Sequence, residues 1–333
     1  MDLKSELERR REIFEKELQK YLQEQEPKML YDAVRHLPLS GGKRLRPILS
    51  IIACEAVGGK IEDVMPFAVS LELIHSFTLV HDDIMDKSTL RRNIKTVHIK
   101  FGESTAIIAG DTLFAKAFEV LHNIKTKEAI EIAFKLSKCV KEICEGQQMD
   151  MEFEKRKIVS EEEYLKMIGK KTASLFKFST EGGAVVGGGS EGEIKALSLY
   201  GWNLGLAFQI RDDYLDIHGE EKILGKDIGN DIRNGKKTIL VVHAIKVAKG
   251  EDKKKLLSLL GKRDATDKEI EEVFEILIII GNIAATITII VGCIMWLSRF
   301  DPNGGKRLLL YGIILAIIIK FLATLKLPSM IMP

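Results

Sequence analysis

The sequence predicts an all-α protein that ends in an apolar helical hairpin. Two observations predict the helices: no proline stands between Pro66 and Pro302, and the strict alternation of apolar and polar residues that marks strands is rare. Long segments of this kind are typical of helices. A third observation places one of them, because residues 67–80 are apolar on nearly every side. Such a helix belongs in the centre of a large bundle.

The elements before the hairpin follow from local composition. Residues 1–25 are dense in Lys, Arg and Glu and lack the apolar stretch of a signal peptide, which predicts a solvated amphipathic helix. Glycine-rich segments at 39–42, 57–59, 187–189 and 225–235 predict loops between later helices. Four cysteines without a Cys-x-x-Cys pair predict buried free thiols in a reducing cytosol.

Overall composition excludes several classes of protein. The 333 residues are 46% hydrophobic and carry 50 basic against 48 acidic groups. These values exclude a disordered, collagen-like or disulfide-scaffold protein. The small excess of positive charge is not typical of a nucleic-acid-binding protein, so no nucleic-acid partner is expected.

The composition changes near residue 276. Residues 276–298 carry no charge, and residues 308–325 carry only Lys320. Each segment is long enough to cross a bilayer core of about 30 Å at about 1.5 Å per helical residue. We therefore expect a domain over 1–275 and an apolar helical hairpin over 276–333, in or on a membrane, with its turn at 299–307. Helices packed on the bundle and a fusion or frameshift tail are the alternatives.

Charge makes the hairpin harder to place. The tail holds five basic residues and one acidic residue, which leaves 45 basic and 47 acidic groups in residues 1–275. Three of the tail's basic residues, Arg299, Lys306 and Arg307, lie in the turn, and positive charge favours the cytoplasmic side. A hairpin attached to a cytoplasmic domain would therefore have to be shallow. We expect residues 1–275 to form a cytoplasmic domain, with membrane association through this tail.

Two short segments share one acidic pattern. Asp82-Asp83-x-x-Asp86 and Asp212-Asp213-x-x-Asp216 each end an apolar helical run. The first and last Asp of each motif stand four residues apart and so share a helix face. Carboxylates this close repel one another unless cations lie between them, and hard oxygen ligands suit Mg²⁺ bridged to phosphate. The pair predicts two carboxylate walls that hold metal ions around a polyphosphate.

Basic residues accompany the two motifs, as a diphosphate ligand requires. Arginine offers a planar fork to phosphate oxygens, and lysine offers a mobile point charge. The candidates lie in Gly-Gly-Lys-Arg-Leu-Arg-Pro at 41–47, in Arg91-Arg92, in Lys170-Lys171-Thr172 and in the segment 225–238 with Lys226 and Lys236.

Together these residues make the chain resemble a known family, the trans-type isoprenyl diphosphate synthases (polyprenyl synthetases), over roughly residues 20–275. The resemblance is greatest to short-chain archaeal-type geranylgeranyl and farnesyl diphosphate synthases. It implies the all-helical isoprenoid synthase fold, a homodimer, and a deep cavity with the two aspartate motifs on opposite helices at its mouth. The matching signatures are 41–47, both aspartate motifs, Arg91-Arg92, Gly146-Gln147, Lys171-Thr172, Phe208-Gln209 and Gly225-Lys226.

The resemblance also implies a role for each matching residue. About three Mg²⁺ ions are expected on Asp82, Asp86 and Asp212, with Asp83, Asp213 and Asp216 in support. The isopentenyl diphosphate site would comprise Lys43, Arg46, His75 and Arg92. The allylic diphosphate site would comprise Arg91, Lys171, Thr172, Gln209, Lys226 and Lys236. His81, next to the first motif, is expected to be structural.

Ionisation, condensation and elimination are the expected reaction steps, without a protein nucleophile. Product length would depend on the cavity beneath the first motif. Phe77, five residues before Asp82, with the small Thr78 beside it, resembles the pattern of C20 synthases, whereas an aromatic residue at position 78 would indicate C15.

Three rival functions remain. A terpene cyclase or head-to-head synthase would share the fold, but the complete second motif and the Lys43, Arg46 and Arg92 set argue against it. A non-catalytic subunit of a heteromeric synthase would usually lose one aspartate motif. A membrane scaffold would make the tail the functional part.

Overall fold

The computed structural model describes residues 3–125, 128–218 and 229–280. The chain divides into two compact units, each with its own hydrophobic core. Among the described residues, the first comprises those through Met149 and Leu165–Gln209, and the second comprises Asp150–Tyr164 and those from Ile210 to Ile280. The predicted helical fold is confirmed over the described residues, where the strands are confined to one short hairpin.

The first unit contains most of the helices. Two of them, α7 (Ala129–Lys155) and α10 (Glu191–His218), begin in this unit and continue into the second, whereas α8 (Glu161–Ile168) begins in the second and ends in the first. The remaining elements are α1 (Leu3–Tyr21), α2 (Lys28–His36), η1 (Pro38–Ser40), α3 (Leu45–Ala56), α4 (Ile61–Met85), β1 (Leu90–Arg91), β2 (Ile94–Lys95), α5 (Val97–Phe101), α6 (Glu103–Leu121), η2 (Gly169–Ala173) and α9 (Ser174–Val186).

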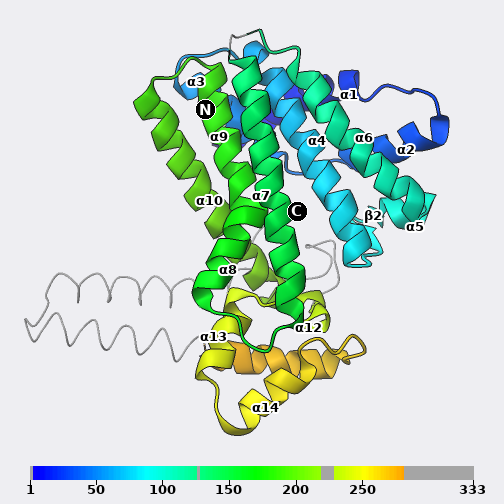
Figure 1. The fold of residues 1–333 in the computed structure, drawn as a ribbon, viewed down its shortest axis with the longest axis vertical. Helices are drawn as coiled ribbons and strands as arrows, with labels where there is room; N and C mark the ends of the chain where they lie inside the picture. Colours follow the sequence, from blue (N-terminus) through cyan, green and yellow to red (C-terminus); the bar gives the residue numbers. More distant parts are fainter. Residues whose placement is uncertain (1–2, 126–127, 219–228, 281–333) are drawn as a thin grey trace, which may run out of the picture. The chain divides into compact units, whose positions relative to one another are not determined.

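Helix α4 is the central helix of the first unit. It packs against α3, α6 and α9 (Figure 1), and Phe67, Leu71 and Ile74 are fully buried. Among the described helices α4 alone is long and apolar enough to cross a membrane, yet 72% of its apolar window is buried within the protein. Burial of this kind marks the core helix of a bundle, which confirms the prediction for residues 67–80.

The amino-terminal helix is amphipathic, as predicted. Phe14 and Leu18 of α1 are fully buried, while its charged residues form exposed or half-exposed ion pairs. The described cysteines are free thiols, with Cys54 and Cys139 buried. Cys144 is exposed, so the expectation of burial is wrong for this residue, which lies on an outer face of α7.

Helix α4 ends at the first aspartate motif and leads into the β1–β2 hairpin. The backbone N–H of Asp86 donates to the carbonyl of Asp82 at 2.8 Å and closes the last turn. In the hairpin Leu90 pairs with Lys95 and Arg91 with Ile94. The two turn residues, Arg92 and Asn93, have φ values of 53° and 61°. Positive φ at both positions matches the right-handed twist of a two-residue hairpin.

A π-helical turn, η2, interrupts the helical segment between α8 and α9. It lies against α7 where that helix carries Gly146. A Cβ atom on Gly146 would lie 2.3 Å from the backbone nitrogen of Lys171, so only glycine allows this approach. The sequence signatures Gly146-Gln147 and Lys171-Thr172 therefore meet at one crossing.

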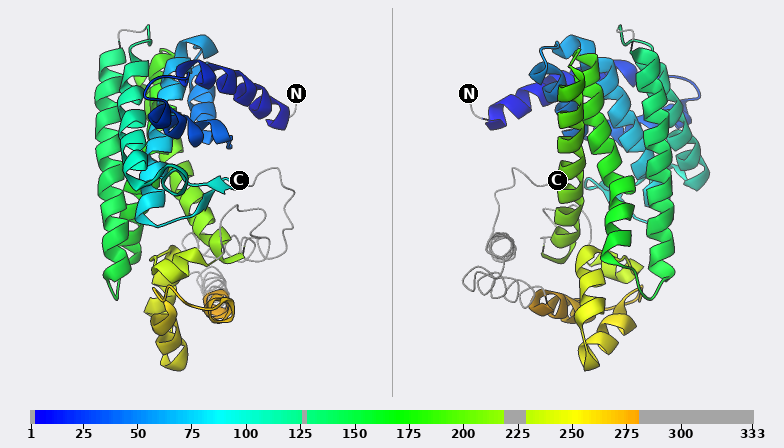
Figure 2. Two further views of the ribbon diagram at one scale, coloured as in Figure 1. Left: turned by 90° about the vertical axis from the view of Figure 1, so that its right-hand side faces the viewer. Right: turned by 60° about the vertical axis from the view of Figure 1, so that its left-hand side comes forward.

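The second unit has a smaller core of short helices, α12 (Asn230–Asn234), α13 (Ile239–Val247) and α14 (Gly250–Leu259), with a further helical segment over residues 267–280 (Figure 2). Val241, Leu256, Val273 and Leu277 are buried in this core. The helical segment runs across position 275, where the domain boundary is predicted. That boundary and the apolar hairpin stay predictions, because residues 281–333 lie outside the described residues.

Candidate active site

The first aspartate motif occupies the carboxyl end of α4. Asp82 and Asp86 are half-buried and lie four residues apart, whereas Asp83 is 1% exposed. Asp83 accepts a hydrogen bond from Arg91 Nε at 2.7 Å. Burial raises the pKa of Asp83 to about 6, although Arg91 acts in the opposite direction. Carboxylates at this end of a helix also face the negative end of its dipole. The motif is therefore a place where added cations are stabilised.

Two cationic side chains converge on Asp82. Lys171 Nζ lies 3.5 Å from one carboxylate oxygen, and Arg91 Nη2 lies 3.9 Å from the other. Lys171 comes from η2, and the adjacent Thr172 donates its hydroxyl to Gln209 Oε1 at 2.7 Å. Four of the residues predicted to bind the allylic diphosphate, Arg91, Lys171, Thr172 and Gln209, thus belong to the first unit. Lys226 lies outside the described residues, and Lys236 belongs to the second unit.

A second basic group lies along α3 and α4. Arg46 Nη1 is 3.2 Å from His75 Nε2, and the Arg46 guanidinium lies 4.5 Å from the centre of the Phe176 ring. Because arginine can only donate, His75 Nε2 accepts and the ring proton belongs on Nδ1. Burial, followed by the charges of Arg46 and Arg92, holds the pKa of His75 well below its usual value. His75 is therefore neutral at pH 7.

Arg46 has a buried guanidinium group whose N–H donors are only partly hydrogen-bonded. Burial lowers its pKa to about 10. Its Nε atom is buried and has no hydrogen-bond partner within the described part of the chain. A buried donor left in this state costs free energy. An anion placed beside Arg46 would use both the charge and the donor.

Arg92 and Lys43 complete the predicted isopentenyl diphosphate group. Arg92, in the hairpin turn, donates to the carbonyl oxygens of Gly41 and Leu37 and so reaches the loop that precedes α3. Lys43 lies in that same loop and is half-buried. Within the first unit, the structure thus links the Arg92 side chain to the loop that carries Lys43.

The second aspartate motif lies on α10 in the second unit. Asp213 is 5% exposed and accepts a hydrogen bond from the Tyr164 hydroxyl at 2.6 Å. Burial, with the Asp213 charge beside it, raises the pKa of Tyr164, so this hydroxyl remains a donor. Asp216 is 1% exposed, and Asp212 is half-buried. Asp213 and Asp216 are thus fixed within the fold, and Asp212 keeps accessible surface.

Lys236 is paired within the second unit. Its Nζ atom lies 2.9 Å from Asp150 and 2.7 Å from Glu154, and the residue is 8% exposed. Lys236, which is predicted to bind the allylic diphosphate, is therefore held by two carboxylates of α7.

Phe77 and Thr78 lie on α4 below the first motif. Phe77 makes an edge-to-face contact with His81 at 4.9 Å and a tilted contact with Phe114 at 5.4 Å. Thr78 donates its hydroxyl to the carbonyl of His75. His81 Nε2 lies 3.1 Å from the carbonyl oxygen of Ile107, which ties its ring to α6.

Comparison with known proteins identifies this arrangement. The polyprenyl synthetase family model matches residues 27–277. The short chain isoprenyl diphosphate synthase of Methanocaldococcus jannaschii is 50% identical over 249 residues, which cover 74% of this chain and 76% of that protein. The chain belongs to the polyprenyl synthetase family.

Solved structures of polyprenyl synthetases show the same helical isoprenoid synthase fold. Geranylgeranyl pyrophosphate synthetase from Pyrococcus horikoshii matches with a TM-score of 0.79 and 37% identity, covering 97% of this chain and 99% of that one. A geranylgeranyl pyrophosphate synthase from Corynebacterium glutamicum, complexed with isoprenyl diphosphate and magnesium, matches with a TM-score of 0.76 and 28% identity, covering 96% and 99%.

The donor chemistry of this polyprenyl synthetase fits Mg²⁺. Both motifs offer only carboxylate oxygens, which are hard ligands. No three Asp, Glu, His or Cys side chains converge on one point among the residues that the structure describes. Mg²⁺ commonly takes one or two carboxylates and completes its shell with water and substrate phosphates. Asp82 and Asp86 in the first unit, and Asp212 in the second, each retain accessible surface, which suits Mg²⁺ bound together with a diphosphate.

The sequence patterns did not predict several residues that hold the side chains expected to bind substrate or metal. Glu72 pairs with Arg92, Tyr164 binds Asp213, and Asp150 binds Lys236. One of them had a signal, because Glu72 is the only charged residue in the apolar segment 67–80. Tyr164 and Asp150 had none, since neither stands at a position that its local pattern distinguishes.

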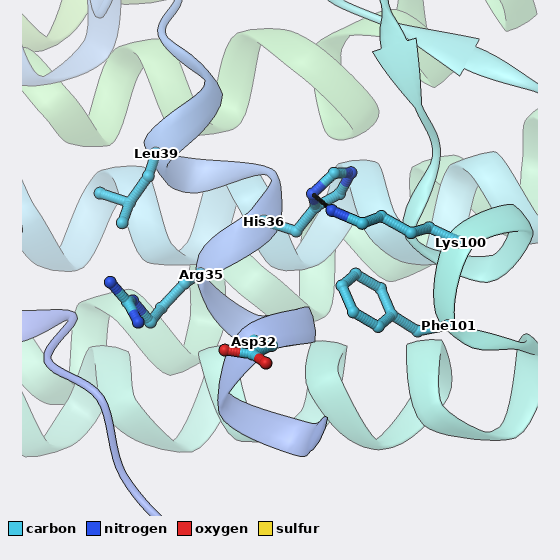
Figure 3. Close-up of a pocket in the computed structure, with 6 residues that line it drawn as sticks. All are labelled: Asp32, Arg35, His36, Leu39, Lys100 and Phe101. Carbon is cyan, nitrogen blue, oxygen red and sulfur yellow. Dashed lines mark hydrogen bonds between the residues drawn. The ribbon is translucent and has the colours of Figure 1, made fainter. Parts of the chain in front are cut away.

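A surface pocket of about 310 Å³ is lined by residues of α2, η1 and α5 (Figure 3). In it Lys100 Nζ lies 3.2 Å from His36 Nδ1. No residue predicted to bind a substrate or metal lines this pocket of the polyprenyl synthetase. The lining residues are Asp32, Arg35, His36, Leu39, Lys100 and Phe101.

Proposed function

We propose that this polyprenyl synthetase is a short-chain trans-isoprenyl diphosphate synthase that makes geranylgeranyl diphosphate for isoprenoid biosynthesis. The observation that carries the proposal is the convergence of Lys171 and Arg91 on Asp82, at the end of a buried helix. Cations and carboxylates brought together in this way are suited to a diphosphate and its metal ions. The M. jannaschii and P. horikoshii relatives carry names for this chemistry.

The residue roles follow the two basic groups. Isopentenyl diphosphate is held by Lys43, Arg46, His75 and Arg92. The allylic diphosphate is held by Arg91, Lys171, Thr172, Gln209, Lys226 and Lys236. Asp82, Asp86 and Asp212 would hold Mg²⁺, supported by Asp83, Asp213 and Asp216.

The chain's own groups bind and orient both substrates. Bound Mg²⁺ would withdraw negative charge from the leaving diphosphate. Lys171 and Arg91 hold that diphosphate while the allylic C–O bond breaks. Arg46 and neutral His75 hold isopentenyl diphosphate so that its double bond attacks the allylic carbon and forms the new C–C bond. The new bond forms at C4 of isopentenyl diphosphate and leaves a cation at C3. A proton then leaves C2 for the departing diphosphate, which restores a double bond and requires no protein nucleophile.

Incorporation of radiolabelled isopentenyl diphosphate by the full chain tests this function. With Mg²⁺ and an allylic diphosphate we expect labelled product, and with excess EDTA we expect none, because the electrostatic help of the metal is lost. Readdition of Mg²⁺ should restore the activity. A chain that gives no labelled product with any C5, C10 or C15 starter would contradict the proposal.

Phe77 sets the product length in this proposal. Its ring is fixed against Phe114 and His81, and replacing it by Ala would remove the barrier below the first motif. We expect Phe77→Ala to form products longer than C20, as measured by chromatography of the dephosphorylated alcohols. Phe101→Ala removes an aromatic ring from the surface pocket and should leave the product at C20. An unchanged product distribution in Phe77→Ala would refute the role.

The quaternary state and the cellular location belong to the same proposal. We infer a homodimer with about three Mg²⁺ ions per active site, as the family resemblance implies. We also place the catalytic domain in the cytoplasm. The residues that would attach it to a membrane lie beyond residue 280, outside the described part of the chain.

A further inference from the structure

Glu72 is a buried carboxylate at the centre of three basic residues. It lies on α4 in the first unit and is 1% exposed. One oxygen, Oε1, pairs with Arg44 Nη1 and lies 3.5 Å from Arg92 Nη2. Its charge also acts on Arg46. Arg44 is itself 3% exposed and reaches Glu15 of α1 at 2.7 Å. Glu72 therefore joins α4 to α1, to the loop before α3 and to the β1–β2 turn.

Both arginines that pair with Glu72 have left-handed backbones. Arg44 has a φ of 52° and Arg92 a φ of 53°. Residues with a Cβ atom seldom adopt this region because it is sterically unfavourable. Such conformations persist where surrounding contacts hold them, and they gather at functional sites. Here one carboxylate binds both side chains, and the loop of Arg44 also carries Lys43.

Stability alone does not account for this arrangement. Taking Glu72 and Arg44 out of water carries a desolvation cost that their attraction often fails to exceed, and apolar side chains of similar size are frequently at least as stable. A geometric role does account for it, because Arg92 and Lys43 are both assigned to isopentenyl diphosphate. Without Glu72, the cations Arg44, Arg46 and Arg92 would repel one another.

We propose that Glu72 is a positioning residue for the isopentenyl diphosphate site. It touches no substrate; it holds the Arg92 guanidinium and the loop of Lys43 in the geometry that receives the diphosphate. This inference rests on the proposed function. It predicts a selective defect, because the allylic group is held by other contacts: Arg91 pairs with Asp83, Lys171 with Asp82, and Thr172 with Gln209.

The test is steady-state kinetics of Glu72→Gln, which keeps the shape and removes the charge. The KM for isopentenyl diphosphate should rise at least about tenfold, the loss expected when a charged hydrogen bond is misplaced. The KM for the allylic substrate should stay within about twofold. Glu55→Gln is the matched control: it breaks the Arg10–Glu55 pair between α1 and α3, and both KM values should be unchanged.

Two further variants separate positioning from folding. Arg44→Met combined with Glu72→Gln removes both buried charges, so it should fold even where Glu72→Gln does not, and it should show the same selective rise in KM. In an Arg92→Ala background, Glu72→Gln should raise the KM for isopentenyl diphosphate by a smaller factor than in the wild type, because the part of its action that passes through Arg92 is already lost.

The outcomes distinguish the two proposals. A wild-type chain without prenyl transfer would overturn the proposed function. An active wild type with a normal KM for isopentenyl diphosphate in folded Glu72→Gln would overturn only the role of Glu72. Equal rises in both KM values, or loss of folding in both Glu72 variants, would show a purely structural residue and overturn the inference as well.

Discussion

Replacing Asp82 by Asn is expected to lower kcat/KM for prenyl transfer by about 10³-fold, the size of effect seen when a main electrostatic contact of an active site is removed. Asp82 lies between Lys171 and Arg91 and shares a helix face with Asp86. The amide keeps the shape but removes the negative charge that would bind Mg²⁺. We also expect the Mg²⁺ concentration for half-maximal activity to rise.

Steady-state rates over a range of Mg²⁺ concentrations measure this effect. Asp32→Asn is the control, because Asp32 is an acidic residue of α2 that lines the surface pocket and pairs with Lys28. It should keep kcat/KM within about twofold, as surface substitutions usually do. If Asp82→Asn retained wild-type kcat/KM at low Mg²⁺, the first motif would not be a metal site.

Replacing Arg46 by Met is expected to weaken isopentenyl diphosphate binding strongly without lowering stability. The diphosphate would lose two charged hydrogen bonds from Arg46, each about 1.5–3 kcal/mol, so KM should rise by at least about 100-fold. Burial holds the pKa of Arg46 at about 10, below its usual value, so the fold disfavours the charged form. That penalty acts at every pH below about 10, where Arg46 is charged in both states. At pH 7 the Tm of Arg46→Met should therefore equal or exceed that of the wild type.

Arg44→Met provides the opposite case two residues earlier in the sequence, in the loop that precedes α3. Arg44 is buried against Glu72 and Glu15, so its removal leaves a buried carboxylate without its main partner. Breaking a buried pair in this way costs about 3–5 kcal/mol. Thermal unfolding should show a lower Tm for Arg44→Met and no decrease for Arg46→Met. A fall in Tm for both would mean that Arg46 serves packing instead of substrate binding.

Local patterns predicted the parts of this fold that depend on neighbouring residues. The buried helix over 67–80 followed from its apolar character, and the placement of Asp82 and Asp86 on one face followed from helical spacing. The family resemblance then grouped residues distant in sequence, such as Lys171 and Asp82, which the structure places 3.5 Å apart.

Contacts across long sequence separations were beyond those patterns. Glu72 meets Arg92 only because a turn with two left-handed residues directs the arginine back onto α4. Asp213 is held by Tyr164, which an amphipathic helix could bury or expose with equal ease. The π turn that carries Lys171 cannot be predicted from residues 169–173 alone, because its close approach to α7 requires a residue without a side chain at position 146.

That crossing of η2 and Gly146 constrains how the sequence can change. A π turn contains one residue more than an α-helix of the same length, so deleting one residue of 169–173 could give a regular helix in which the later side chains of α9 keep their directions, but the π turn that carries Lys171 would be lost. Any side chain at 146 would push the turn away from α7. The approach of Lys171 to α7 therefore depends on two sites 25 positions apart, the π turn and Gly146, and a change at either one would move it.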